Sequence, residues 1–202
     1  MKKLLAIAAL FAATSGAYAQ NIVVDGGFES QSQAAGTWNV YSSLLGWNTA
    51  AGAGVEVRNQ VAGNAFEGNN YIELDSYYNS AIAQTLATTT AGGVYTLSFE
   101  YSARGGVSLA SNPVQVFWNG TLLDTVSLDG SNQSGNVWYG YSYAVQALGN
   151  DVLKFAASGT NDSLGGSLDA VTVSAVPEPS TYALMAAGLV LIGFSRRRRN
   201  LR

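Results

Sequence analysis

Apolar and polar residues alternate in short segments along most of the chain, and no segment between residues 20 and 175 follows a helical period. In VYTLSFEY (residues 94–101), for example, large apolar side chains take every second position, as on a strand with one buried face. Gly, Asn, Ser and Asp separate these segments, which are rich in β-branched and aromatic residues. The predicted strands are residues 21–24, 38–41, 55–58, 70–74, 81–86, 94–101, 114–118, 121–128, 138–145, 152–157 and 168–174.

Turn chemistry favours antiparallel pairing of these strands. Asn119-Gly120 lies between two predicted strands and supplies the positive φ angles that a type I′ hairpin turn needs. About eleven short antiparallel strands without an internal repeat predict an all-β domain built as a two-sheet sandwich.

The C-terminus has a different pattern, with three parts in succession. Pro177-Glu178-Pro179 is stiff and extended, residues 182–194 are apolar and uncharged, and Arg196, Arg197, Arg198 and Arg199 follow, with Arg202 beyond them. A helix over the apolar run would be roughly 20 Å long, against about 30 Å of bilayer hydrocarbon. Such a marginal transmembrane helix suits a signal that is held briefly and then cut, with the arginines in the cytoplasm. The alternative is an ordinary single-pass anchor.

This ordered set, over residues 176–202, resembles the PEP-CTERM sorting signal of Gram-negative bacteria. The resemblance implies recognition by exosortase, a membrane transpeptidase, and a transient stay of the C-terminal helix in the inner membrane. It also implies release or transfer of the protein to the outer cell surface or the extracellular matrix. Proteins with this signal typically accompany exopolysaccharide production in biofilms or flocs.

The N-terminus has the features of a secretory signal peptide read by the Sec machinery. Lys2 and Lys3 precede an apolar run at residues 4–13, and Ala17 and Ala19 form an A-x-A pattern, so cleavage is expected after Ala19. An uncleaved anchor is the alternative. The predicted organisation is therefore a signal peptide (1–19), a β-sandwich domain (20–175) and a sorting signal (176–202).

The composition of the domain excludes several kinds of binding partner and catalytic site. Residues 20–175 hold Arg58, Arg104 and Lys154 against twelve carboxylates, a formal net charge of −9. Such an acidic domain is repelled by phosphate backbones, so we expect no nucleic-acid partner. The chain has no cysteine and no histidine, which excludes disulfides, thiol catalysis, a Ser-His-Asp triad and ordinary catalytic zinc sites.

The order of short motifs across residues 21–174 gives a second resemblance. VVDGGFES, Gly46-Trp47, VEVR, FEGNNYIELDS, IAQTL, YTLSFEYSAR, VFWNGTLL and GGSLDAVTVS follow one another along the chain. This succession resembles the galactose-binding-like jelly rolls of extracellular bacterial proteins. It implies the architecture of a carbohydrate-binding module, whereas fold alone does not establish sugar binding.

Four acidic residues are candidates for a structural calcium site. Glu29 and Asp169 flank the domain, and the first and last strands of a jelly roll usually lie side by side, so both carboxylates are expected within reach of one cation. Proteins of the resembled fold often carry such a Ca²⁺, and Asp25 and Asp162 are possible further ligands. Alternatively, Glu29 and Asp169 cap turns or accept hydrogen bonds from backbone amides.

A second acidic pair, Glu73 and Asp75, would share one face of an extended strand. Paired carboxylates are the minimum for glycoside hydrolysis, but two like charges on a strand usually only face water. We therefore expect no enzyme and no catalytic residue, with a carboxylate-dependent polysaccharide hydrolase or lyase as the alternative.

Exposed aromatic residues are the candidates for sugar binding. Tyr77 and Tyr78 lie where a strand gives way to a loop, and Tyr139 and Tyr141 share a face that forms either a binding platform or one half of the core. Arg104 either bridges a carboxylate or holds an acidic sugar, and the same alternatives apply to Arg58. The sequence thus favours a non-enzymatic surface or matrix protein that associates with exopolysaccharide. A purely structural or adhesive spacer is a further alternative.

Overall fold

The computed structural model of the chain describes residues 20–176 and Gly188. Residues Asn21–Val176 form one compact unit. Its strands are β1 (Thr37–Tyr41), β2 (Ser43–Leu44), β3 (Trp47–Ala51), β4 (Val55–Asn59), β5 (Asn70–Glu73), β6 (Ala81–Leu86), β7 (Val94–Ser102), β8 (Val114–Trp118), β9 (Thr121–Val126), β10 (Tyr139–Gln146), β11 (Asp151–Ala157) and β12 (Ser167–Ala175).

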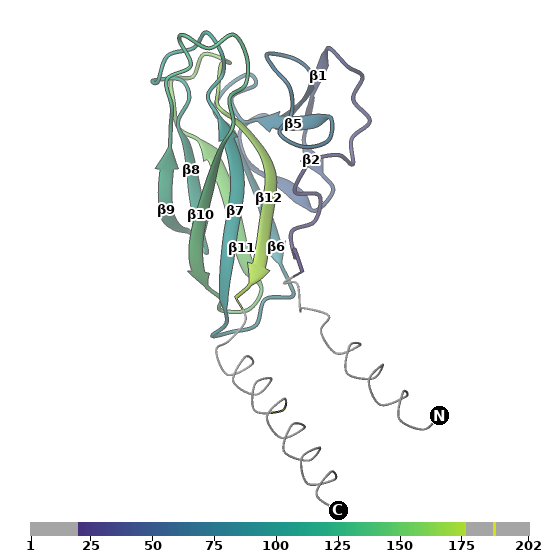
Figure 1. Cartoon of the computed structure of the whole chain (residues 1–202), viewed down its shortest axis with the longest axis vertical. Coiled ribbons are helices and arrows are strands. Elements are labelled where there is room, and N and C mark those ends of the chain that lie inside the picture. The colour runs from purple at the N-terminus through teal and green to yellow at the C-terminus, as the bar shows by residue number, and fades with distance from the viewer. Residues whose placement is uncertain (1–19, 177–187, 189–202) are drawn as a thin grey trace, which may run out of the picture. The chain divides into compact units, whose positions relative to one another are not determined.

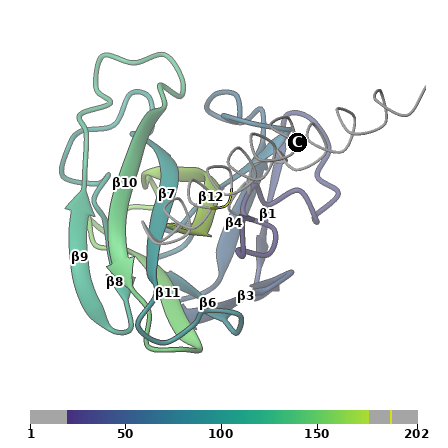
Figure 2. The ribbon, with the colours of Figure 1, turned by 60° about the horizontal axis from the view of Figure 1, so that its bottom comes forward.

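The strands form two antiparallel sheets, which lie as two layers in Figure 2. Sheet A has the order β1-β4-β5-β12-β7-β10, and sheet B has the order β2-β3-β6-β11-β8-β9. This arrangement confirms the predicted all-β, jelly-roll sandwich.

The sandwich has two different ends (Figure 1). At the end where β12 begins, three long connections (residues 103–113, 127–138 and 158–166) gather with the connection at residues 74–80, and we call this the loop end. At the other end, where β12 finishes, the connections are shorter: residues 87–93, 119–120 and 147–150. We call this the tail end, because the chain continues from it into the C-terminal segment.

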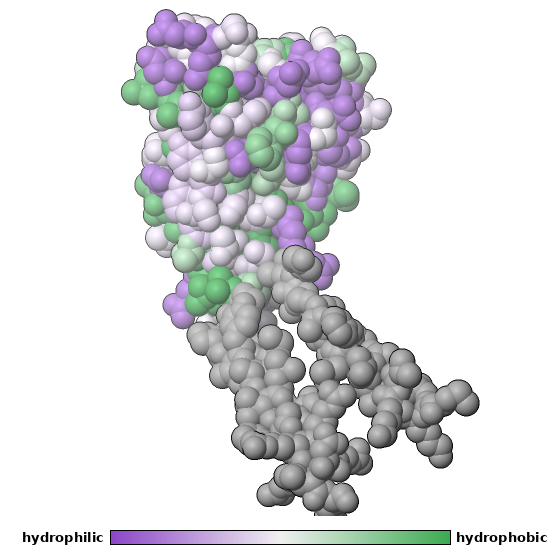
Figure 3. Space-filling model, viewed as in Figure 1, coloured by the Kyte–Doolittle hydropathy of each residue, from purple (hydrophilic) through white to green (hydrophobic). Residues whose placement is uncertain are grey.

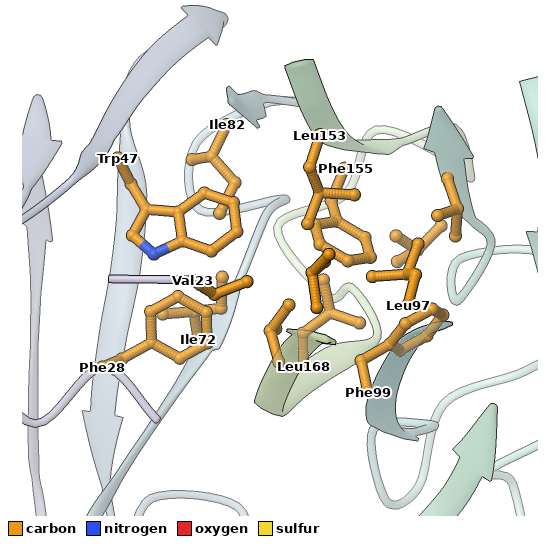
Figure 4. Packing of buried hydrophobic residues seen from close by; sticks show 14 of the residues in the cluster. Val23, Phe28, Trp47, Ile72, Ile82, Leu97, Phe99, Leu153, Phe155 and Leu168 are labelled. Carbon is orange, nitrogen blue, oxygen red and sulfur yellow. The ribbon is translucent and has the colours of Figure 1, made fainter. Parts of the chain in front are cut away.

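The core lies between the sheets and is made of the alternating apolar residues that predicted the strands (Figure 4). Trp47 packs between Phe28 and Phe155, with ring centroids 5.8 and 6.2 Å apart. Phe155 in turn meets Phe99 edge-on at 5.0 Å. Trp47 and Trp118 are both buried. Burial of each such side chain contributes about 1.5–3 kcal/mol.

A β-bulge in β12 adjusts which side chains face the core. The register against β7 shifts between Asp169 and Thr172, and Ala170 has a φ of +50°. The extra residue lets Leu168 and Val171 both point inward, although a regular strand would place them on opposite faces. It also leaves the Asp169 side chain on the outer side of sheet A, beside residues 66–67.

The prediction of a strand at residues 21–24 is wrong. The Ile22 amide donates to the Val173 carbonyl of β12, but a side chain binds Val24: Gln84 accepts a hydrogen bond from the Val24 amide and donates one to the Val24 carbonyl. Strands β2 and β3 were missed, since β2 has only two residues and the residues of β3 after Trp47 lack an alternating apolar pattern.

Candidate functional site

Two adjacent tyrosines project from the loop end. Tyr77 and Tyr78 follow β5 and have 62% and 48% of their surface exposed. They occupy the connection that crosses from sheet A to sheet B, where no strand neighbour covers them. Their predicted exposure is therefore present in the structure.

The connection that carries these tyrosines is fixed on both sides. Before them, the buried Asp75 carboxylate accepts hydrogen bonds from the amides of Asp162 and Leu164. After them, Asn79 donates its amide to the side chain of Asn161 and its side chain to the carbonyl of Gly159. The two phenol rings are thus carried by a backbone that is anchored to the neighbouring connection 158–166.

The other two predicted sugar-binding tyrosines lie elsewhere. Tyr139 begins β10 and is 47% exposed, and β12 and β7 separate β10 from β5 in sheet A. At about 4.8 Å per strand, this places β10 roughly 14 Å from the strand that leads to Tyr77. The four tyrosines do not form one platform.

Tyr141 belongs to the core, which was one of the two alternatives. Its ring stacks on Phe99 at 5.6 Å and meets Tyr101 edge-on at 6.0 Å. Tyr143, on the same face, stacks on Phe99 and donates a hydrogen bond to the Asp124 carboxylate. These contacts hold β10 against the sandwich.

The four charged side chains Glu56, Arg58, Glu73 and Arg104 form an ion-pair network at sheet A. Arg58 pairs with both Glu56 and Glu73, and Arg104 approaches Glu73 at 3.1 Å. Arg104 also donates to the carbonyl of Ser163. Both arginines therefore have the structural role that the sequence left open, and Arg104 is committed to protein partners.

Glu73 and Asp75 do not form a catalytic pair. Strand β5 ends at Glu73, so the two side chains do not continue on one face, and their exposed fractions are 1% and 0%. Burial raises the pKa of Glu73 to about 7, against the lowering effect of Arg58. A polysaccharide could not reach either carboxylate in this arrangement.

An aromatic cluster that the sequence did not single out lies over the outer side of sheet A. Trp138 meets Tyr71 at 5.7 Å and Phe66 at 6.5 Å, in both cases edge-on, and its indole N–H donates to the carbonyl of Asn64. Phe66 is 51% exposed. The tryptophan lay in a predicted strand, but its partners are Tyr71 on β5 and Phe66 on the connection before β5, and a strand pattern does not show that these segments meet.

Glu29 and Asp169 bind the same short backbone segment. Glu29 accepts hydrogen bonds from the amides of Asn69 and Asn70, and Asp169 accepts them from the amides of Phe66 and Glu67. Burial raises the pKa of Asp169 to about 7, although these amides act in the opposite direction. This geometry matches the second alternative of the sequence analysis, in which the carboxylates bind backbone amides.

The remaining two calcium candidates have partners of their own. Asp25 accepts hydrogen bonds from the amide and hydroxyl of Ser30, and Asp162 accepts them from the Ser111 hydroxyl and the Leu164 amide. Within residues 20–176, no group of three or more acidic side chains is arranged to hold a metal ion. Calcium binding stays a prediction.

A polar pocket of about 310 Å³ lies beside Glu29. Asn59 and Asn70 line it as well, and their side-chain oxygens are buried and accept no hydrogen bond from any residue that the structure describes. Their side-chain amides instead donate to the carbonyls of Phe28, Gln31 and Gln33. These two unsatisfied oxygens belong to residues that line the same pocket as Glu29.

The predicted sorting and cleavage residues lie outside the described part of the chain. These residues are Ala17, Ala19, Pro177, Glu178, Pro179, Arg196, Arg197, Arg198 and Arg199. In residues 20–176 and at Gly188, no helix is long and apolar enough to cross a membrane.

Parts of two very long curated proteins are similar to this chain. A multifunctional-autoprocessing repeats-in-toxin protein of Vibrio vulnificus is 30% identical over 156 residues, and its counterpart in Vibrio cholerae is 29% identical over 173 residues. These matches cover 76% and 84% of this chain, but the chain spans only 3% of each toxin.

Solved structures are similar at the level of the fold. The K1 cleaved adhesin domain of Lys-gingipain from Porphyromonas gingivalis has a TM-score of 0.53 at 14% identity, over 70% of this chain and 98% of that one. A family 35 carbohydrate-binding module from Clostridium thermocellum has a TM-score of 0.43 at 17% identity, over 68% and 97%. Residues 175–199 match the PEP-CTERM protein-sorting motif. The chain therefore carries a PEP-CTERM sorting motif directly after a jelly-roll domain.

Proposed function

We propose that this chain is an exported, exosortase-processed protein of the cell surface or extracellular matrix, whose jelly roll binds polysaccharide at the loop end. The sorting motif at residues 175–199 supports export and processing. It follows β12 directly, and β12 runs from the loop end to the tail end. The loop end is therefore opposite the point where the sorting signal is attached.

The exposed pair Tyr77–Tyr78 is the observation that carries sugar binding. Tyrosine rings offer flat apolar faces on which the C–H groups of a pyranose can stack, with a hydroxyl at the rim for hydrogen bonding. Asn161 on the neighbouring connection is exposed, and although its side-chain oxygen accepts the Asn79 amide, its NH2 group is a donor suited to sugar hydroxyls. The anchored backbone reduces the ordering cost of binding.

Calcium beside Glu29 is part of the proposal. Ca²⁺ takes carboxylate and amide oxygens, and the buried oxygens of Asn59 and Asn70 are acceptors of this kind in the same pocket. A cation there would stabilise the contact between residues 28–33 and the ends of β4 and β5.

The test is retention of the full chain on a panel of bacterial exopolysaccharides, with calcium and again with EGTA. We expect binding by the native chain and its loss in the double variant Tyr77→Ala, Tyr78→Ala. Trp38→Ala is the matched control, since this aromatic residue is 48% exposed but lies on the edge strand β1 and not on a loop-end connection, and it should bind as the native chain does.

The possible outcomes separate the proposals. Equal retention of the Tyr77/Tyr78 variant and the native chain would move sugar binding away from the loop end. No retention of a folded native chain on any polysaccharide would favour the structural or adhesive spacer instead. Loss of binding only in EGTA would make calcium essential for the site.

A further inference from the structure

The tail end of the domain presents apolar side chains on and beside uncharged connections. Val94, Leu122, Leu148, Val152 and Val176 lie on its connections or on the strand ends beside them, and each is between 36% and 73% exposed. Figure 3 shows hydrophobic, green surface at this lower end of the domain. The residues of the connections 87–93, 119–120 and 147–150 are all uncharged.

The carboxylate that borders the turn at residues 147–150 is directed inward. Asp151 is 1% exposed, and it accepts hydrogen bonds from the amides of Leu148 and Gly149 and from the side chain of Asn119. These bonds fix the turn at residues 147–150. Leu148, at 73% the most exposed large hydrophobic residue of the described chain, is therefore held outward by a rigid turn.

The loop end differs in charge. Asp129 and Asp162 are exposed there, and the domain as a whole carries a formal charge of −9. An acidic surface is repelled by the anionic lipids of a bacterial membrane. Only the tail end combines apolar side chains with an absence of exposed carboxylates among the described connections.

The connection between the tail end and the apolar run is short. The Val176 amide donates to the Val94 carbonyl at 2.8 Å, so the backbone is fixed to β7 up to residue 176. Five residues, 177–181, separate Val176 from the apolar run that begins at Tyr182. Even fully extended, this connection spans about 20 Å. Headgroups cover roughly 5–8 Å on each side of the hydrocarbon, so the tether brings the tail end close to them.

We propose that the tail end is a lipid-contacting surface, and that Leu148 inserts into the headgroup layer while the sorting tail still lies in the membrane. The contact orients the domain with its loop end toward the periplasm or exterior, and it holds the segment before Pro177 at a fixed height above the bilayer. This inference rests on the membrane residence of the sorting tail, but not on sugar binding.

The absence of cysteine makes a direct test possible, because one introduced thiol is labelled uniquely. The full chain is prepared as Leu148→Cys and, for comparison, as Leu109→Cys at the loop end, where Leu109 is 51% exposed. Both thiols are labelled with a polarity-sensitive fluorophore. The proteins are reconstituted into vesicles of phosphatidylethanolamine and phosphatidylglycerol that contain nitroxide-labelled lipid.

We expect nitroxide lipid to quench the label at position 148 several-fold more than the label at 109, with no difference between them in lipid-free solution. Equal quenching at both positions, in chains that float with the vesicles, would overturn the lipid contact but leave sorting and sugar binding intact. Chains that do not float would contradict both this inference and membrane residence. A change in the emission of the label at position 148 that occurs only after exosortase is added would assign the surface to the enzyme instead.

Discussion

Asp169 and Glu29, from opposite ends of the domain sequence, hold one stretch of backbone between them. Asp169 accepts the amides of Phe66 and Glu67, and Glu29 accepts the amides of Asn69 and Asn70. The two carboxylates thereby fix the segment that carries Phe66 against the Trp138 ring. Each makes a separate, measurable contribution to stability.

Replacing these carboxylates should lower the free energy of unfolding. Glu29→Ala leaves two amides without an acceptor and should cost about 1–3 kcal/mol in urea denaturation. Asp169→Ala should cost more, because Asp169 is fully buried and water cannot replace it. Glu67→Ala, at an exposed neighbouring position, should stay within about 0.5 kcal/mol of the native chain.

Calcium removal gives an independent measurement on the same residues. If Glu29 holds Ca²⁺, EGTA lowers the Tm of the native chain and leaves the Tm of Glu29→Ala unchanged. A native Tm that is the same in calcium and in EGTA would contradict the calcium proposal, while the hydrogen-bond prediction for Glu29 would stand.

Removal of Arg58 should be strongly destabilising. Arg58→Leu leaves Glu56 and Glu73 buried without their shared cation, and breaking such a buried network costs about 3–5 kcal/mol. Arg104→Leu is the matched comparison, because its side chain is 20% exposed and Glu73 keeps Arg58. Equal losses of unfolding free energy for the two variants would show that burial of Arg58 is not decisive.

The pKa of Glu73 predicts how stability changes with pH. Burial raises this pKa from 4.5 to about 7, so between these values the folded chain binds a proton that the unfolded chain does not. Stability from this group is therefore fully present below about pH 4.5 and is lost as the pH rises through about 7. Urea denaturation across this range should show a steeper decline for the native chain than for Glu73→Gln.

Gly26 should tolerate no side chain. A Cβ placed there would lie 2.0 Å from the carbonyl oxygen of Val171, whose amide donates to the Gly26 carbonyl. Gly26→Ala should cost about 1–3 kcal/mol by forcing the N-terminal segment away from β12. Gly135→Ala, where a Cβ meets its nearest neighbour at 3.5 Å, should be close to neutral. A neutral Gly26→Ala would mean that residues 21–27 contribute little to stability.

The strand pattern could be predicted from the sequence wherever one face is buried. In β7, alternation placed Leu97 and Phe99 correctly on the core side. The pattern failed at residues 21–24. There the Gln84 side chain, rather than a neighbouring strand, binds the backbone of Val24, and such a contact leaves no periodic pattern in the sequence. It also could not predict the bulge at Ala170, which shows only in three dimensions.

The sequence predicted that Tyr77 and Tyr78 are exposed, but it could not predict which tyrosines lie together. Tyr77 and Tyr78 are exposed because turn residues surround them, which is a local property. Whether Tyr139 lies beside them depends on the order of the strands within sheet A, and the pattern of residues along the chain does not predict that order. From the sequence, Glu73 and Asp75 looked like an accessible pair. The groups that cover them in the fold, two arginine side chains and a backbone amide, lie far from them in the sequence, so the local pattern does not reveal them.

The position of β12 has a consequence for the order of events during export. This last strand lies in the interior of sheet A, between β5 and β7, and pairs with both. Without it, sheet A would consist of two separate parts, β1-β4-β5 and β7-β10. In a chain exported N-terminus first, these two parts can join only after residues 167–175, the strand directly before the sorting motif, have crossed the membrane.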